Sequence, residues 1–269
     1  MTEEQAPSYW TIDSPQIIDI DDVRALRVSI VGGRLDVITH EEPTTRIEVA
    51  DITGTPLNVS FHGGTLTVEH HDQNPMSWLK RIGSFGHQHI VLSIAVPAGT
   101  PVRASTVSGE GLISGTSGNS ELKTVSGSVM ADGTSGLLTT DTVSGEIIVR
   151  DHRGPFVAKS VGGEITASGE LLNVRAKTIS GDLSFDFQGS PNDLAMSSVS
   201  GDVTVRLPAE VGVALNVKSV SGRIIVDDQK YSGTNQRVET ITGAEDRQLR
   251  LNGNSVSGNI SIIHQVPAR

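Results

Sequence analysis

The sequence predicts an all-β protein, built as a parallel β-helix or solenoid with rungs of 18–21 residues. Three observations support this fold class. A five-residue phrase recurs from residue 106 onward, apolar and polar residues alternate around it, and the composition is rich in Gly and poor in aromatic side chains. The 269 residues include 29 Gly but only 3% aromatic residues. This composition favours a narrow interior of small and aliphatic side chains.

The recurring phrase has the form Thr-Val-Ser-Gly followed by one further residue. Its copies are TVSGE (106), TVSGS (124), TVSGE (142), SVGGE (160), TISGD (178), SVSGD (198), SVSGR (219), TITGA (240) and SVSGN (255). The steps between their glycines are 18, 18, 18, 18, 20, 21, 21 and 15 residues. A strand–helix–strand unit needs about 30 residues, so these internal repeats predict stacked rungs made of strands alone.

Apolar residues keep fixed distances from the phrase glycine, at seven, five and two residues before it and two and four after it. Alternation with a period of two predicts strands with one buried face, so we expect Val107 and its equivalents to lie in that pattern. The parity changes between the upstream pairs, which predicts a bend at the Lys-Thr step (Lys123-Thr124). The phrase glycine either has positive φ or points inward where no Cβ fits; the unbroken alternation favours the inward position.

Three regions are expected along the chain: an N-terminal arm or cap (1–24), an N-terminal β region (25–100) and the repeat β-solenoid (101–265). We expect one continuous fold, because no linker-like composition separates the last two. A solenoid also needs its open end covered. Tyr9, Trp10 and Ile12 are candidates for that cover.

The N-terminal β region contains two similar pieces, residues 25–40 and 56–71, each with strands on both sides of a Gly-Gly pair. Each is either a hairpin or a degenerate rung of the solenoid. Both alternatives stay open at this point, because alternation alone does not distinguish them.

Residues 72–88 interrupt the β pattern. Trp78, Ile82 and Phe85 recur at helical spacing, with Leu79 beside them. The segment is either a loop packed on the flank of the stack or a contact site for a partner protein or a membrane surface.

Composition and charge exclude several classes of function. A formal net charge of −10 argues against nucleic-acid binding. The absence of Cys excludes disulfides and thiolate sites. No apolar run is long enough to span a membrane, and the acidic start shows no secretory signal. From these features we expect a cytoplasmic protein.

An acidic column follows the phrase glycine at outward positions, and its members are Glu110, Glu146, Glu164, Asp182 and Asp202. Stacked rungs place such neighbours about 4.8 Å apart. The column is either a solvated edge that opposes aggregation or a weak strip for divalent cations or polycations. A basic column lies upstream, at Lys123, Lys159, Lys177 and Lys218, and we expect it to balance the acids across the bend.

No residue pattern points to catalysis. The phrase serines lack a neighbouring His that could act as a base, and we expect them to be outward hydroxyls. The eight His lack the spacing of a metal site, and we expect them on the surface or in loops. We therefore expect no catalytic residue, no cofactor and no metal ion. The candidate interaction surface combines Trp78, Leu79, Ile82 and Phe85 with the acidic column.

The phrases TVSGE, TISGD and SVSGD resemble those of a bacterial putative-adhesin repeat family of unknown function, over roughly residues 25–265. The resemblance implies a β-solenoid, carries over no catalytic residue, and suggests a cytoplasmic or membrane-proximal accessory role linked to envelope stress. We therefore expect a non-enzymatic scaffold or interaction module whose partner is a protein or a cell-envelope component. The alternatives are a glycan-binding or glycan-active β-helix and a solenoid that stacks end to end.

Overall fold

The computed structural model describes residues 8–70, 88–243 and 247–265. Within these ranges the regular secondary structure is β-strand, without a helix, so the all-β prediction is confirmed. The chain divides into two compact units, Met1–Val129 and Met130–Arg269. This division falls inside the repeats, and the three regions expected from sequence stay predictions.

Unit 1 is built from two rows of strands. Its strands are β1 (Ser8–Ile12), β2 (Gln16–Ile20), β3 (Ala25–Ile30), β4 (Gly33–His40), β5 (Thr45–Thr53), β6 (Leu57–His62), β7 (Thr65–His70), β8 (His89–Pro97), β9 (Val102–Thr106), β10 (Glu110–Ser114) and β11 (Ser120–Thr124). One row has the order β1-β6-β7-β3-β9-β11, and the other β2-β5-β8-β4-β10. Strand β12 (Val129–Asp132) crosses the division between the units.

The two Gly-Gly pieces of unit 1 fold differently. Residues 25–40 form β3 and β4, which pair in parallel with their neighbours on both sides and so make a rung. Residues 56–71 contain the antiparallel hairpin of β6 and β7, which turns at Gly63 and Gly64, both with positive φ. Each alternative is therefore realised once, because only the second piece places both glycines in the conformation that a tight hairpin requires.

Strands β1 and β2 form one end of the two rows of unit 1. β1 pairs antiparallel with β6, and β2 pairs antiparallel with β5. Of the three residues proposed for the cover, Ile12 is fully buried and Trp10 is half-buried. Tyr9 is 74% exposed, so it does not contribute to the core.

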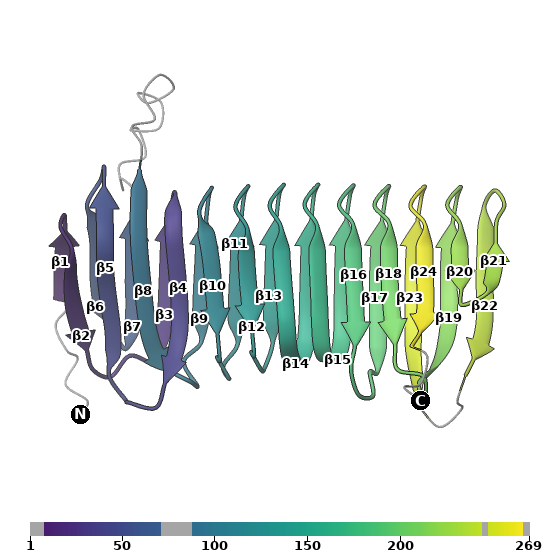
Figure 1. Cartoon of the computed structure of the whole chain (residues 1–269), viewed down its shortest axis with the longest axis horizontal. Coiled ribbons are helices and arrows are strands. Elements are labelled where there is room, and N and C mark those ends of the chain that lie inside the picture. The colour runs from purple at the N-terminus through teal and green to yellow at the C-terminus, as the bar shows by residue number, and fades with distance from the viewer. Residues whose placement is uncertain (1–7, 71–87, 244–246, 266–269) are drawn as a thin grey trace, which may run out of the picture. The chain divides into compact units, whose positions relative to one another are not determined.

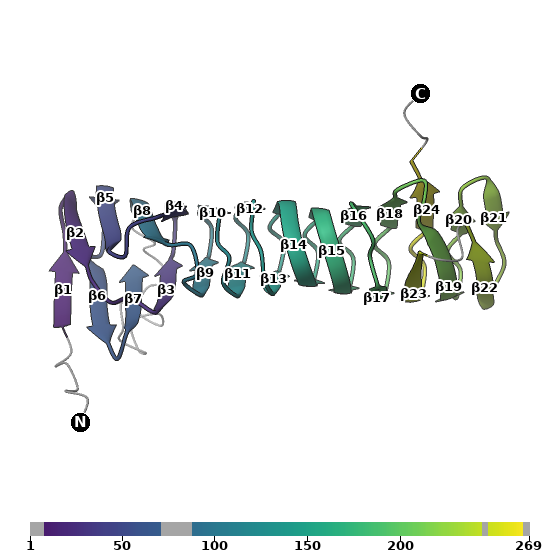
Figure 2. The same cartoon turned by 90° about the horizontal axis from the view of Figure 1, so that it is seen from below.

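Unit 2 has the same construction. Its strands are β13 (Leu138–Thr142), β14 (Ile147–Ser160), β15 (Ile165–Thr178), β16 (Leu183–Phe187), β17 (Asp193–Ser198), β18 (Val203–Leu207), β19 (Gly212–Ser219), β20 (Ile224–Val226), β21 (Gln229–Tyr231), β22 (Gln236–Thr242), β23 (Gln248–Ser255) and β24 (Ile260–His264). One row is β13-β14-β15-β17-β23-β19-β22, and the other is β14-β15-β16-β18-β24-β20-β21. Figure 2 shows the two rows of this unit as separate layers.

Both units interrupt the sequential order of their rungs. In unit 2 the last strand pair, β23 and β24, lies between β17/β18 and β19/β20 (Figure 1). In unit 1, β3 and β4 lie between β7/β8 and β9/β10. The strands at the row ends, β1 and β2 in unit 1 and β21 and β22 in unit 2, pair antiparallel with their neighbours. The sheet is therefore mixed, and the uniformly parallel solenoid expected from sequence is too simple.

The core is made by four of the five apolar columns that the sequence analysis identified. The columns seven and five residues before the phrase glycine, and two and four after it, are buried. Leu194, Met196, Val203 and Val205 represent them in one rung, with exposed fractions of 0–5%. Parallel strands at about 4.8 Å spacing stack such residues into continuous aliphatic columns, which accounts for a core with few aromatic rings.

Candidate interaction surfaces

Each phrase forms a corner where the chain passes from one row of strands to the other. At the corner of β13 and β14, the backbone N–H of Gly145 donates to Oγ1 of Thr142 at 2.9 Å. The Thr142 hydroxyl in turn donates to the carbonyl of Gly145 at 2.9 Å. The first and fourth residues of the phrase therefore point inward and close the corner with a local side chain–backbone pair.

The phrase glycines lie inward because neighbouring rungs approach too closely for a Cβ. A Cβ on Gly181 would lie 1.9 Å from the carbonyl oxygen of Gly163. The inward interpretation is confirmed for the eight buried phrase glycines Gly109, Gly127, Gly145, Gly163, Gly181, Gly201, Gly222 and Gly258. Gly243 differs, since it is exposed and has a φ of +79°.

The second residue of the phrase is exposed, so its assignment to the buried pattern was wrong. Val143 is 48% exposed and Ile179 53%. The second and third residues both point outward between an inward first and an inward fourth residue. The bend therefore lies at the Val-Ser step, because alternation runs without a break through the Lys-Thr step where we had placed it.

These second residues form a continuous apolar line in unit 2, which we call the aliphatic ridge. Its members, in spatial order, are Val143, Val161, Ile179, Val199, Val256 and Val220. Backbone hydrogen bonds between successive corners establish that order. At about 4.8 Å per rung the ridge extends over about 24 Å. All six side chains are β-branched and between 44% and 53% exposed, so the ridge is a contiguous apolar line on the surface of unit 2.

The phrase serines lie beside the ridge and are exposed, as expected. Their hydroxyls donate to the carbonyl of the ridge residue in the neighbouring rung: Ser180 to Val161 at 3.2 Å, and Ser257 to Val199 at 3.2 Å. The same contact joins Ser221 to Val256. These hydroxyls therefore cover backbone carbonyls next to the ridge, and their role is structural.

The acidic column is exposed at each predicted position, with Glu110 in unit 1 and the other four members in unit 2. Part of it binds backbone. The Asp182 carboxylate accepts the N–H of Asp202 at 2.8 Å, and the Asp202 carboxylate accepts the N–H of Asn259 at 2.8 Å. Asn259 Oδ1 in turn accepts the backbone N–H of Arg223. The inserted rung therefore places the Asn259 amide between the carboxylates and Arg223, which the sequence order did not predict.

The basic column does not balance the acids across the bend. Lys123 Nζ lies 2.5 Å from the Glu121 carboxylate, and Lys159 Nζ lies 3.8 Å from Asp141. Both partners share a row of strands with their lysine. Alternation along the strands explains this result. It places each lysine and its partner acid on the same outer face, whereas the acidic column lies on the other side of the corner.

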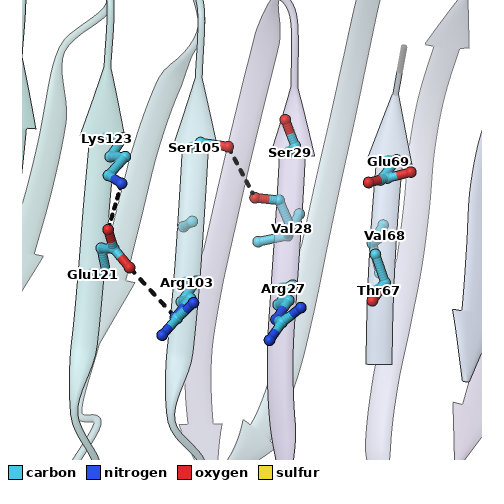
Figure 3. A pocket seen from close by; sticks show the side chains of 11 residues that line it. Arg27, Val28, Ser29, Thr67, Val68, Glu69, Arg103, Ser105, Glu121 and Lys123 are labelled. Carbon is cyan, nitrogen blue, oxygen red and sulfur yellow. Dashed lines mark hydrogen bonds and ion pairs between the residues drawn. The ribbon is translucent and has the colours of Figure 1, made fainter. Parts of the chain in front are cut away.

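A shallow groove of about 290 Å³ lies on the outer face of β7, β3, β9 and β11 in unit 1 (Figure 3). Two lines of polar side chains cross these strands in register. The first is Thr67, Arg27, Arg103 and Glu121, and the second is Glu69, Ser29, Ser105 and Lys123. Sequence analysis singled out only Lys123 here, because pairing between β3 and β9 joins distant parts of the chain.

The charges in this groove are unevenly paired. The Glu121 carboxylate forms ion pairs with Arg103, whose Nε lies at 3.3 Å, and with Lys123. Arg27 is exposed and makes no ion pair or hydrogen bond through its guanidinium with any residue that the structure describes. In Figure 3 the Arg27 and Arg103 side chains lie at the same level of adjacent strands, so two cations are neighbours without a carboxylate between them.

A second groove, of about 430 Å³, lies on the outer face of β14, β15, β16 and β18 in unit 2. A line of hydroxyls runs across it and on to β24, formed by Thr166, Ser184, Thr204 and Ser261 in register. Arg150, Asp186 and Arg206 flank this line. This hydroxyl line was not predicted from the sequence. The alternation that predicts the core residues also identifies the residues between them as outward-facing, so the line could have been found.

Two histidines contradict the expectation of surface or loop positions. His70 and His152 are fully buried. His152 lies 2.9 Å from Thr134 Oγ1, and its Nε2 lies 3.3 Å from the carbonyl of Pro155. Burial lowers the pKa of His152, and hydrogen bonds with the backbone of Pro155 and of Thr134 oppose that shift. Within the described ranges no group of three or more potential metal ligands converges.

The apolar segment proposed as a contact site is not placed by the structure. Trp78, Leu79, Ile82 and Phe85 lie outside the described residues, and their role stays a prediction. No residue in the described ranges belongs to a helix that could cross a membrane.

The fold and surfaces define an all-β protein with polar lines on its outer faces and exposed corners. The chain belongs to the Toastrack DUF4097 family, whose sequence model matches residues 36–263. A putative-adhesin repeat family of unknown function was expected from the sequence; the match confirms a family of unknown function, and the repeat as a mark of that family stays a prediction. A comparison with curated proteins finds no match.

A comparison with solved structures matches chains from three bacteria at low identity. A putative cell adhesion protein from Clostridium sporogenes has 14% identity, a TM-score of 0.30, and coverage of 94% of this chain and all of its own. A putative lipid binding protein from Parabacteroides distasonis has 15% identity, a TM-score of 0.49 and 97% coverage of each chain. A putative adhesin from Bacteroides fragilis has 12% identity, a TM-score of 0.43, and coverage of 93% of this chain and 97% of its own.

Proposed function

We propose that the protein is a non-enzymatic, adhesin-like interaction module that binds a partner protein along the aliphatic ridge. The observation that carries the proposal is the unbroken exposure of six β-branched side chains in consecutive rungs of unit 2. Apolar area of this kind costs free energy in water, at roughly 25 cal/mol per Å². A partner that covers the ridge recovers that free energy.

The surroundings of the ridge favour a protein partner with an apolar line of its own. The serines beside it already donate to backbone carbonyls, so the ridge itself offers methyl groups. The acidic column lies near the ridge, because each of its members directly follows a phrase glycine. Its members in unit 2 are Glu146, Glu164, Asp182 and Asp202. A partner with aliphatic side chains flanked by Lys or Arg would match both lines. The link to envelope stress and the cytoplasmic, membrane-proximal location stay predictions.

Replacing ridge residues with threonine tests the proposal. Val161→Thr, Ile179→Thr and Val199→Thr, combined in one chain, keep a β-branched side chain at each corner while removing apolar area. Each site is exposed, so we expect the free energy of unfolding to change by about 0.5 kcal/mol or less per substitution. We expect the partner recovered from the native host with wild-type protein to be lost with this triple variant.

Leu172→Thr is the matched control, because Leu172 is 40% exposed in unit 2 but lies off the ridge. Recovery of the partner should be unchanged with this control. Equal recovery with the triple variant and with wild type would contradict the proposal.

A second candidate function is glycan binding on the hydroxyl line of unit 2. Thr166, Ser184, Thr204 and Ser261 place one hydroxyl per strand at the regular spacing of the sheet, beside a groove of about 430 Å³. Thr166→Val combined with Thr204→Val preserves shape and removes two hydroxyls. A glycan-array signal that this variant loses, and that the ridge variant keeps, would favour this candidate over the first.

A further inference from the structure

We infer that Arg27 and Arg103, in the groove of unit 1, form a binding site for a phosphate ester group. The two residues are direct register partners on the parallel strands β3 and β9. Their strands are about 4.8 Å apart, and both side chains lie on the same outer face (Figure 3). This site is separate from the ridge, because every residue that lines it belongs to unit 1.

The charge arrangement is unfavourable without a ligand. Like charges directly opposite each other on neighbouring strands repel. Glu121 binds Arg103 from one side and also holds Lys123, whereas Arg27 has no ion pair within the described residues. The groove therefore presents two adjacent guanidinium groups of which one is uncompensated, in a chain whose formal net charge is −10.

A phosphate monoester matches this arrangement in charge and geometry. It carries close to two negative charges at neutral pH and three acceptor oxygens. Guanidinium groups recognise such oxygens through paired N–H donors. Two arginines on adjacent strands can each donate to a different oxygen of one phosphate. A single carboxylate carries only one negative charge and so compensates two guanidinium groups less completely.

The second line of the groove supplies contacts for the rest of the ligand. Ser29 and Ser105 lie two residues further along β3 and β9, on the same face as the arginines. Their hydroxyls can donate to an ester oxygen or bind the hydroxyls of an attached alcohol. Glu69, beside Ser29 in register, favours a ligand whose organic part is neutral or cationic rather than a long polyanion.

Titration of the full-length protein with inorganic phosphate and with glycerol 3-phosphate tests the site. We expect saturable binding by calorimetry that weakens as salt is added, because both partners are charged and exposed. Arg27→Gln removes one charge-assisted donor pair, so the affinity should fall by about tenfold or more. Glu121→Gln removes the competing carboxylate and should raise the affinity.

Arg175→Gln is the matched control. Arg175 is exposed on β15, and its register partners are Val157 and Ala195 instead of a second arginine. This change removes the same charge from the chain, so phosphate affinity should remain as in wild type. An equal loss with both variants would overturn the site, because it would reduce the effect to net charge.

Vesicles of phosphatidylcholine, with and without phosphatidic acid, identify the source of the phosphate group. Binding of glycerol 3-phosphate that Arg27→Gln weakens supports a soluble ester. Binding confined to vesicles with phosphatidic acid, and weakened by the same variant, supports a lipid headgroup. The inference is overturned if no probe binds to wild type, or if Arg27→Gln binds every probe as tightly as wild type does.

Discussion

At the scale of single residues, the phrase Thr-Val-Ser-Gly gives each position a different physical role. The threonine closes the corner through its hydroxyl, as Thr142 does with Gly145. The serine covers the carbonyl of the neighbouring corner, as Ser180 does with Val161. The glycine permits close approach of rungs, and the second residue exposes a β-branched side chain, as Val161 and Ile179 do. This is why the second residue is the position from which we infer an interaction.

The phrase glycine allows a direct test of the corner geometry. A Cβ at Gly181 would meet the carbonyl oxygen of Gly163 at 1.9 Å, so Gly181→Ala must push two rungs apart. We expect a loss of at least about 1–3 kcal/mol in the free energy of unfolding, measured by urea denaturation. Gly99→Ala is the control, since a Cβ there meets nothing within 4 Å. Similar stability of the two variants would contradict this account of the corner.

The buried His152 predicts a pH dependence of stability. Its pKa in the folded protein lies below the ordinary value of 6.5, so the unfolded chain binds the proton more readily. The stability contributed by neutral His152 is complete above pH 6.5 and is lost as the pH falls below that value. His152→Gln should reduce the drop in melting temperature between about pH 7 and about pH 5. A variant with the wild-type pH profile would exclude His152 as the cause.

Sequence patterns predicted the core well at this scale and the corners poorly. Period-two alternation located buried residues such as Leu194 and Val203, because a strand side chain has only two faces to choose between. Val143 was misassigned because a position that is apolar in every repeat looks the same in the sequence whether its side chain is buried in a strand or exposed at a corner. The spacing of Thr142 and Gly145, three residues apart as in other local side chain–backbone pairs, is the signal that could have placed the bend.

At the scale of elements, the inserted pair β23 and β24 joins β17 and β18 to β19 and β20 in unit 2. Each of its strands pairs in parallel on both sides. His264 fastens β24 to the turn after β20, through its Nδ1 at 2.8 Å from the Asp227 carboxylate and its backbone N–H at 2.9 Å. Sequence could not predict this order, because every rung has the same register positions. The short last step of 15 residues was the visible irregularity.

Truncation tests the role of the inserted pair. A chain that ends at Gly243 lacks β23 and β24, so β17 and β18 each lose their partner on one side and expose backbone donors and acceptors. We expect a lower melting temperature and concentration-dependent association in sedimentation experiments. A chain that ends at Gln265 keeps all strands and serves as the control. A monomeric Gly243-terminated chain with the wild-type melting temperature would show that the insertion is dispensable.

At the scale of the whole molecule, the two proposed surfaces belong to different units and differ in chemistry. The ridge of unit 2 is aliphatic, and the groove of unit 1 contains three cationic and two acidic side chains. Substitutions at sites that share no interaction partners usually have additive effects. The ridge triple variant should therefore bind glycerol 3-phosphate like wild type, and Arg27→Gln should retain the protein partner. Loss of both functions in either variant would point to a general folding defect, which a melting curve would reveal.

The central claim is that the aliphatic ridge contacts a partner protein, and site-specific photo-crosslinking tests it most directly. A crosslinking residue at Ile179, on the ridge, is compared with one at Ile148, on the outer face of β14 in the same unit. We predict a crosslinked product of one defined mass from the Ile179 position in the native host. The product should disappear when Val161→Thr and Val199→Thr are added, and the Ile148 position should not give it. The same product from both positions, or none from Ile179, would contradict the claim.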